Sequence, residues 1–332
     1  MSSLKLSLAC WDYDRTRALQ DGTVKPEGVD LNFIPLRVEE TFFRMLRHRE
    51  FDVAEMSLSS YVMTLADEEP PFIAIPIFPS KFFRHGNIYI NKQSGITSPS
   101  DLRGRNVGVA EFQMTAGVWQ RGILAEEYDV PVESVHFWTG GVDEPGRIEK
   151  LPLKLPSQLN VTAIAGDRCL SDMLESGEID ALMCAVGPSC FTEQKNCQIG
   201  RLFEDYPDVE ADYYRRTGIM PIMHTVAIRR DVYKANPWVA QSLTKAFNRA
   251  QELTFPGLVD TGALKYMLPW LTAEVERTRA VFGKYNFWEY GLEANHGTLV
   301  KFLQYSHDQG LASRRYAPEE LFAPEALEAW KK

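Results

Sequence analysis

The sequence predicts an α/β protein with two lobes, and three observations support this prediction. The chain has 332 residues, which exceeds the roughly 250–300 residues at which a single hydrophobic core stops growing. Short apolar runs alternate with stretches of helical periodicity along most of the chain, as in parallel α/β sheets. The composition, with 45% hydrophobic and 24% charged residues, is that of a folded globular protein.

The expected strands are short apolar or alternating runs, and the expected helices follow them at helical period. In chain order the strands cover residues 4–9, 29–35, 51–54, 87–91, 106–110, 135–138, 162–165, 179–185 and 226–229, and residues 72–77 form a further apolar run punctuated by proline. The helices cover residues 15–21, 38–49, 57–66, 114–128, 170–176 and about 237–254. Gly22 and Gly177 end two of these helices, and the chain from residue 272 onward is mainly helical.

Charge and the length of the apolar runs exclude several classes of protein. The chain has 36 Lys and Arg against 45 Asp and Glu, so its net charge of -9 would repel nucleic acid and anionic membranes. Its longest apolar runs fall far short of the roughly 18 residues of a membrane span. Residues 1–14 contain no apolar core of signal-peptide length, so we expect a cytoplasmic protein without nucleic-acid or membrane partners.

The cysteines point to reduced thiols. The chain has five of them, an odd number, without a CxxC pair or the Cys/His spacing of a zinc site. They are Cys10, Cys169, Cys184, Cys190 and Cys197. We therefore expect buried free thiols and no disulfide framework.

Two sequence strings resemble those of type II periplasmic-binding-protein-like folds. They are DLRGRNVGV at residues 101–109, similar to the entry into the second lobe, and MLESGEIDA at residues 173–181, similar to a helix-to-strand turn of that fold. The resemblance implies two α/β lobes joined by two crossovers, with a ligand cleft between them. Lobe one would comprise residues 1–90 and 222–332, with a helical C-terminal region, and lobe two residues 91–221.

Four further strings resemble the 4,5-dihydroxyphthalate decarboxylase family. They are ACWDYDRT at residues 9–16, FDVAEMSLSSY at 51–61, FPSKFFRH at 78–85 and EFQMTA at 111–116. With two later segments, the resemblance covers roughly residues 4–255. It implies a carboxy-lyase of aromatic and phthalate degradation that converts 4,5-dihydroxyphthalate to 3,4-dihydroxybenzoate (protocatechuate) and carbon dioxide. The alternatives are a non-catalytic binder of a small carboxylate and a biosynthetic or regulatory relative; a homo-oligomer is left open.

Polar turns after three expected strands are the candidate ligand-binding positions, because ligands of open α/β sheets bind beyond the carboxyl ends of the strands. Each turn supplies a carboxylate beside hydroxyl or amide groups. The expected substrate-binding residues from these turns are Asp12, Ser57, Ser59, Gln113 and Thr115, and the turns also contain Glu55 and Glu111. The alternative is that the hydroxyl groups only cap helices and that Asp12 only complements a helix dipole.

Two histidines lie where the two crossovers are expected, so His85 and His224 would face one cleft. The alternative is that both are hinge residues that never touch a ligand. In the decarboxylase hypothesis, His224 or Glu55 removes a phenolic proton, and His85 or Glu111 protonates the ring carbon. These four residues are the expected catalytic groups. The ring can act as its own electron sink, so we expect no organic cofactor.

Arginines and aromatic residues complete the expected site. Arg15 and Arg84 flank the proposed cleft, and a guanidinium binds a carboxylate through two parallel charge-assisted hydrogen bonds. Trp11 is expected to stack on the flat ring of an aromatic carboxylate ligand. We expect no metal site; a divalent metal at Asp12, Glu55, Glu111 and a histidine is the alternative.

Overall fold

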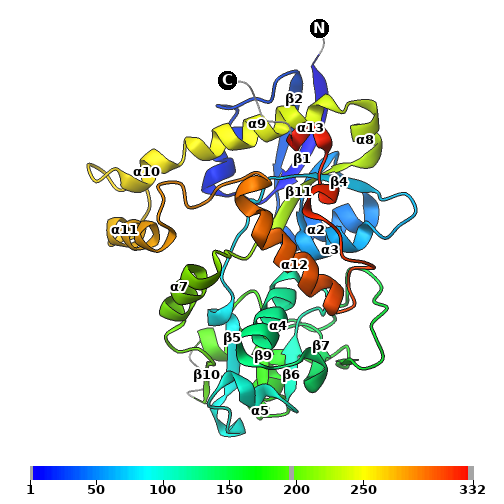
Figure 1. Cartoon of the computed structure of the whole chain (residues 1–332), viewed down its shortest axis with the longest axis vertical. Helices are drawn as coiled ribbons and strands as arrows, with labels where there is room; N and C mark the ends of the chain where they lie inside the picture. The colour runs from blue at the N-terminus through cyan, green and yellow to red at the C-terminus, as the bar shows by residue number, and fades with distance from the viewer. Residues whose placement is uncertain (1–2, 194–197, 328–332) are drawn as a thin grey trace. The chain divides into compact units, whose positions relative to one another are not determined.

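The computed structural model describes residues 3–193 and 198–327, and the chain divides into two compact units. The first unit contains the chain up to Lys81, the segment Tyr214–Val300 and the chain from Tyr316 on. The second contains Phe82–Tyr213 and Lys301–Arg315. Each unit is built around its own β-sheet (Figure 1).

The sheet of the first unit has five strands in the order β2-β1-β3-β11-β4. These strands are β1 (Leu4–Cys10), β2 (Val29–Pro35), β3 (Val53–Ser57), β4 (Phe72–Ile75) and β11 (His224–Arg229). β1 pairs parallel with β2 and β3, whereas β11 runs antiparallel to both of its neighbours. All five residues of β3 are buried, which suits a strand at the centre of a sheet covered on both faces.

Helices of the first unit pack against this sheet and against one another. They are α1 (Arg17–Gln20), α2 (Val38–His48), α3 (Leu58–Thr64), α8 (Arg230–Ala235), α9 (Trp238–Glu252), α10 (Phe255–Val259), α11 (Leu271–Phe282) and α13 (Pro324–Leu327), with the 3-10 helices η1 (Asp14–Thr16), η6 (Glu293–Asn295) and η7 (Pro318–Leu321). α2 buries Phe42 and Met45 beside β3 and carries acidic residues in its first turn and basic residues in its last, which complements the helix dipole.

The sheet of the second unit has six strands in the order β10-β5-β9-β6-β7-β8. They are β5 (Ile88–Asn91), β6 (Asn106–Val109), β7 (His136–Thr139), β8 (Asn160–Ala163), β9 (Ala181–Met183) and β10 (Ile199–Arg201). β6, β7, β8 and β9 are parallel, and β5 is antiparallel to β9 and β10.

The helices of the second unit follow the strand-helix alternation of the sequence. They are α4 (Thr115–Tyr128), α5 (Leu170–Ser176), α6 (Ser189–Thr192) and α7 (Tyr206–Thr217), with η2 (His85–Asn87), η3 (Lys92–Ser94), η4 (Pro99–Leu102) and η5 (Val132–Ser134). The end of α7, from Tyr214 on, belongs to the first unit. Helix α12 (His296–Asp308) is divided between the units, and its residues from Lys301 on belong to the second unit. α5 ends where Gly177 adopts the left-handed conformation (φ 79°), as the sequence predicts.

The α/β fold class and most of the expected elements are confirmed. Elements outside the sequence prediction include β10, which is only three residues long, the charged helix α7 and the short helices α6 and α8. Residues 301–315, which the sequence prediction gave to lobe one with the rest of the C-terminal region, belong by their contacts to the second unit.

The described cysteines are buried free thiols, as the sequence predicts. Cys10, Cys169, Cys184 and Cys190 are buried and free, whereas Cys197 lies outside the described residues. Within residues 3–193 and 198–327, no helix combines the length and apolar character needed to span a bilayer.

Candidate functional site

The carboxyl edge of the first unit's sheet collects polar side chains from three strands. β1 ends at Cys10, β3 carries Glu55, and the antiparallel β11 begins at His224, opposite Ser57. Because β11 runs in the opposite direction, its first residue lies at the same edge as the last residues of β1 and β3. The β1–β3 register of Ala9 opposite Ala54 then sets Cys10 beside Glu55.

Glu55 is the centre of a hydrogen-bonded cluster, and its side chain is fully buried. Its Oε1 lies 2.6 Å from His224 Nδ1 and accepts a 2.6 Å hydrogen bond from the Tyr13 hydroxyl. Its Oε2 accepts hydrogen bonds from the Trp11 backbone N–H (3.0 Å) and the Cys10 thiol (3.5 Å). Both carboxylate oxygens therefore have two partners each, which is the number a carboxylate oxygen ordinarily accepts.

The protonation states of this cluster follow from its surroundings. Burial by itself raises the pKa of Glu55, but the charge that His224 has when it is protonated, together with the hydrogen bonds from His224, Tyr13 and Trp11, brings that pKa below its usual value. Burial and the neighbouring Glu55 carboxylate raise the pKa of Tyr13 and of Cys10 well above their usual values. At neutral pH, Glu55 is thus an acceptor, so His224 carries a proton on Nδ1.

Arg15 lies beside this cluster and is held from several sides. Its Nε donates to the Pro79 carbonyl (2.6 Å) and its Nη1 pairs with Asp14 (2.9 Å). Its guanidinium carbon lies 4.1 Å from the ring centroid of Tyr13 and 4.3 Å from that of Trp288, within cation–π distance of both. Only 17% of the Arg15 side chain is exposed.

Sequence patterns do not indicate the parts that Tyr13 and Trp288 play in this cluster. Tyr13 lies in the same turn as Asp12, so its position in the sequence indicates that it is near the site. The spacing of residues along the chain does not indicate that its hydroxyl donates to Glu55 on β3. Trp288 lies more than 270 residues from Arg15, and its indole Nε1 donates to the Phe78 carbonyl (3.1 Å). No local pattern indicates such a contact.

The remaining expected residues of the first unit are not all in the cluster. Trp11 has a 38% exposed side chain and joins the cluster only through its backbone. Asp12 lies in an exposed ion pair with Arg17 (2.7 Å). Ser57 caps α3 by accepting a hydrogen bond from the Ser60 N–H (3.4 Å), and Ser59 is fully buried within that helix. These contacts favour the capping alternative for Ser57 and a surface role for Asp12.

In the second unit, Glu111 follows β6 and is 1% exposed. Arg147 donates to its Oε1 through Nε (2.8 Å) and Nη2 (2.6 Å), and Lys150 Nζ donates to the same oxygen. The neighbouring Gln113 side chain donates to Glu149 and to the Leu151 carbonyl, both at 3.0 Å. Thr115 is the buried first residue of α4, and the capping position belongs to Met114. The 147–151 loop thus folds onto this turn.

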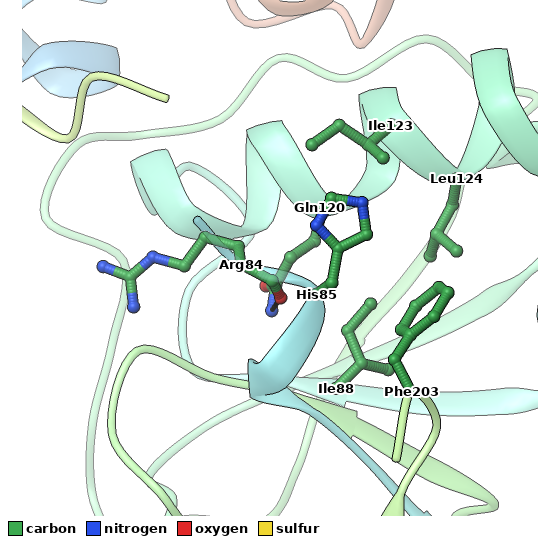
Figure 2. Close-up of a pocket in the computed structure, with 7 residues that line it drawn as sticks. All are labelled: Arg84, His85, Ile88, Gln120, Ile123, Leu124 and Phe203. Atoms are coloured by element: carbon green, nitrogen blue, oxygen red, sulfur yellow. Dashed lines mark hydrogen bonds between the residues drawn. The ribbon is translucent and has the colours of Figure 1, made fainter. Parts of the chain in front are cut away.

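His85 lies within the second unit among apolar side chains that include Phe203, Ile123 and Leu124 (Figure 2). It is 2% exposed, and its ring centroid is 5.3 Å from those of Phe203 and Tyr213. Its Nδ1 lies 3.9 Å from Glu210. The adjoining cavity, lined also by Ile123 and Leu124, measures about 10 Å³, which is no more than the space of one water molecule. These contacts favour the alternative in which His85 is structural.

Arg84 precedes His85, but its guanidinium is turned away from the histidine ring in Figure 2. It is 8% exposed, donates to the Ala185 carbonyl (3.1 Å) and lies over the ring of Phe82 (4.8 Å). Burial lowers the pKa of Arg84 to about 10, so it remains charged at neutral pH. The structure therefore brings together Glu55, His224, Trp11 and Arg15 in one unit, and His85, Arg84, Glu111 and Gln113 belong to the other.

A metal centre was the alternative use of these acids and histidines. In the part of the chain that the structure describes, no group of three or more His, Cys, Asp or Glu side chains is arranged to hold a metal ion.

The fold is shared with solved periplasmic binding proteins. The aliphatic sulphonate-binding protein of Escherichia coli aligns over 98% of this chain and 99% of its own, with a TM-score of 0.54 and 10% identity. The alkanesulfonate-binding protein of Xanthomonas axonopodis aligns over 98% of both chains, with a TM-score of 0.51 and 11% identity. At such identities the likeness concerns the fold, which is the two-lobed periplasmic-binding-protein fold that the sequence strings indicate.

No family model matches the chain, but two curated relatives do. The 4,5-dihydroxyphthalate decarboxylase of Comamonas testosteroni is 41% identical over 331 residues and covers 100% of both chains. The protein of the same name from Pseudomonas putida is 44% identical over 215 residues, which cover 65% of this chain and 83% of that one. The chain belongs to the 4,5-dihydroxyphthalate decarboxylase family.

Proposed function

We propose that this protein removes one carboxylate of 4,5-dihydroxyphthalate as carbon dioxide, without oxidation, and releases 3,4-dihydroxybenzoate. Family membership supports the reaction. The single structural observation that carries the mechanism is the 2.6 Å contact between the buried Glu55 carboxylate and His224 Nδ1. This contact fixes one ring nitrogen of His224 and leaves the other for chemistry.

The substrate supplies the electrons for this reaction. One hydroxyl of 4,5-dihydroxyphthalate lies para to the carboxylate that departs. Loss of the proton from that hydroxyl increases electron density at the carbon bearing the carboxylate, so that this carbon accepts a proton. The C–C bond to the carboxylate then breaks and its electron pair restores the aromatic ring. The enzyme must therefore remove a phenolic proton, allow the ring carbon to be protonated and hold a ring that carries two carboxylates.

We assign the removal of the phenolic proton to Nε2 of His224. Glu55 holds the proton on Nδ1, so Nε2 has the lone pair of a general base. Glu55 itself is poorly suited to take the proton because Tyr13, His224, Trp11 and Cys10 already use its acceptor positions. Glu55 is thus a positioning residue, in the way that a buried carboxylate orients the histidine of a catalytic triad.

The expected proton donors to the ring carbon, His85 and Glu111, have contacts that favour other roles. The Glu111 Oε1 accepts hydrogen bonds from Arg147 and Lys150, and His85 lies among aromatic rings beside a cavity of about 10 Å³. We therefore assign the phenolic proton to His224 and give neither of these residues a proton-transfer step. The proton that the ring carbon accepts comes from solvent water, and His224 returns the phenolic proton when carbon dioxide has left.

Arg15 is proposed to hold a substrate carboxylate. Its Nε and Nη1 are bonded to Pro79 and Asp14, and its Nη2 makes no hydrogen bond within the described chain. The flanking rings of Tyr13 and Trp288 fix the guanidinium plane, which reduces the entropy lost when an anion binds. The exposed Trp11 ring remains the proposed stacking surface, and Arg84 the proposed second carboxylate ligand; the affinity of Arg84→Ala for phthalate tests the latter.

The experiment measures carbon dioxide release from 4,5-dihydroxyphthalate by purified, chelator-treated protein. We expect turnover by the wild type and a loss of about 10²–10⁴-fold in His224→Ala with substrate binding retained. His136→Ala is the matched control, because His136 is exposed at the start of β7; its rate should equal that of the wild type. Binding without any carbon dioxide release by the wild type would instead support the non-catalytic binder. Full activity of His224→Ala would exclude the assigned base.

The proposed cytoplasmic location and the oligomeric state are tested separately. Cell fractionation with the antibody-detected native protein should place it with cytoplasmic markers, and light scattering of the purified chain reports whether it assembles.

A further inference from the structure

Tyr290 lies on a segment that is tied on both sides to the loop following β4. Before it, the Glu289 carbonyl accepts a hydrogen bond from Lys81 Nζ (2.7 Å), and Trp288 Nε1 donates to Phe78. After it, the Gly291 N–H donates to the Pro76 carbonyl (2.8 Å). β4 is parallel to β3, since both are antiparallel to β11, so this loop leaves the sheet at the edge that carries Glu55.

The hydroxyl of Tyr290 is buried without a hydrogen-bond partner within the described residues. The side chain is only 7% exposed, and its oxygen is inaccessible. A buried hydroxyl is normally hydrogen-bonded, because burial without a partner costs the free energy of desolvation. A ligand that accepts the hydrogen of this hydroxyl would remove that cost.

The charges that act on this hydroxyl belong to the candidate site. Arg15 is the first of them, followed by Cys10, Asp14 and Glu55. Burial raises the pKa of Tyr290 well above its usual value despite the nearby Arg15, so the hydroxyl stays protonated and offers a hydrogen. The hydroxyl lies on the segment whose Trp288 ring packs against Arg15, and it is thus a neutral donor that no described residue accepts from.

We propose that the Tyr290 hydroxyl, together with Arg15, binds a carboxylate of the aromatic ligand at the carboxyl edge of the first sheet. This inference rests on the proposed function for the class of ligand. A carboxylate oxygen would accept from Arg15 and from Tyr290 at once, which satisfies the buried hydroxyl and adds a directional contact to the charge of the guanidinium. Tyr290 is then a specificity-determining residue that distinguishes carboxylated rings from rings with hydroxyl groups alone.

The test compares Tyr290→Phe with the wild type by titration calorimetry. Phthalate, which has both carboxylates and no hydroxyl groups, and catechol, which has the hydroxyl groups and no carboxylate, are the two ligands. We expect the dissociation constant for phthalate to rise about 10- to 100-fold, as for a lost hydrogen bond to a charged group, while that for catechol is unchanged. The melting temperature of the ligand-free variant should not fall, because the removed hydroxyl has no partner among the residues that the structure describes.

Tyr61→Phe is the control for a structural tyrosine. Its buried hydroxyl donates to the Leu321 carbonyl and accepts from the Ala74 N–H (3.0 Å), so this variant should melt at a lower temperature with unchanged phthalate affinity. The inference fails if Tyr290→Phe keeps wild-type affinity for phthalate, or if it loses catechol affinity instead. Carbon dioxide release by the wild type is measured in parallel. If phthalate affinity depends on Tyr290 but no carbon dioxide is released, the decarboxylase proposal alone is rejected. If the wild type binds neither phthalate nor catechol, the decarboxylase proposal and the role of Tyr290 are both rejected.

Discussion

Each unit buries a glutamate at the end of a strand, but the two glutamates have different partners. Glu55 is 0% exposed and Glu111 is 1% exposed. Around Glu55, the donors are an imidazole, a phenol, a thiol and a backbone N–H. Around Glu111, the side-chain donors are the permanently charged Arg147 and the ammonium of Lys150.

The difference separates side chains that are suited to proton transfer from side chains that are suited to holding a loop. An imidazole can both accept and donate a proton, so the Glu55 cluster suits the general-base role that we propose for His224. Arginine does not lose its proton in proteins, so the pairing with Glu111 mainly offsets the cost of burying a carboxylate and fastens the loop from Arg147 to Lys150. Burial of an acid at a strand end is therefore a weak signal of catalysis until its partners are known.

The largest expected effect is on the rate of Glu55→Gln. The amide cannot fix the proton on His224 Nδ1 as a carboxylate does, so kcat should fall by about 10²–10⁴-fold while the folded structure is retained. Glu111→Gln is the matched control and should stay within a few-fold of the wild-type kcat. A comparable rate loss in Glu111→Gln, with normal melting, would return Glu111 to the chemistry and remove the distinction between the two units.

The next largest effect is on the stability of Glu111→Ala. Removal of the carboxylate leaves Lys150, whose side chain is 10% exposed, and Arg147 without their anion. We expect a loss of about 3 kcal/mol in the free energy of unfolding, at the lower end for a broken buried pair because Arg147 is partly exposed. Urea titration measures this loss, and Glu111→Gln, which keeps an acceptor oxygen, should lose less. An unchanged urea midpoint for Glu111→Ala would show that the ion pairs of Glu111 with Arg147 and Lys150 do not stabilise the fold.

The pH dependence of stability should have opposite signs for Glu55 and for Glu210 of the second unit. Burial raises the pKa of Glu210 to about 7, so its contribution is present below its ordinary pKa and is lost as pH rises through 7. Glu55 has a lowered pKa, so its contribution is present above its ordinary pKa and is lost in acid. Relative to the wild type, Glu210→Gln should gain roughly 2 kcal/mol between pH 4.5 and pH 8 in urea titrations. If the free energies of unfolding of the wild type and of Glu210→Gln changed equally with pH, the raised pKa of Glu210 would be refuted.

The smallest effect is expected for Asp12→Asn. Asp12 pairs with Arg17 at the surface, where 56% of the arginine side chain and 36% of the aspartate side chain are exposed. Such pairs contribute about 0–1 kcal/mol, so stability and kcat should both stay close to the wild type. A large rate loss in this variant would place Asp12 in the site beside Glu55 after all.

The sequence predicts the sheets well because their strands are short apolar runs, and a buried strand such as β3 needs such a run wherever it lies. It misses β10, whose Ile-Gly-Arg sequence has too few residues for a pattern, and α7, whose many charged residues leave only Ala211 and Tyr213 buried. Glu55 and His224 were candidates from their turns, but their pairing depends on the register of β11 against β3. The ion pairs of Glu111 and the position of Tyr290 beside the β4 loop depend on contacts between residues that are distant along the chain. Local sequence periodicity does not predict such contacts.

The second unit includes the distant segment Lys301–Arg315, so its continuous part alone does not form a complete core. Gln309 accepts a hydrogen bond from the buried Arg121 Nε (2.8 Å) and donates to the Val118 carbonyl (2.9 Å), while Phe302 packs against Trp119 with ring centroids 5.5 Å apart. A fragment of residues 82–213 would expose the Trp119 indole and deprive Arg121 of this partner. Grafting or exchanging that fragment between relatives would therefore transfer an incomplete core, and a soluble chimera requires the distant fifteen-residue segment to travel with it.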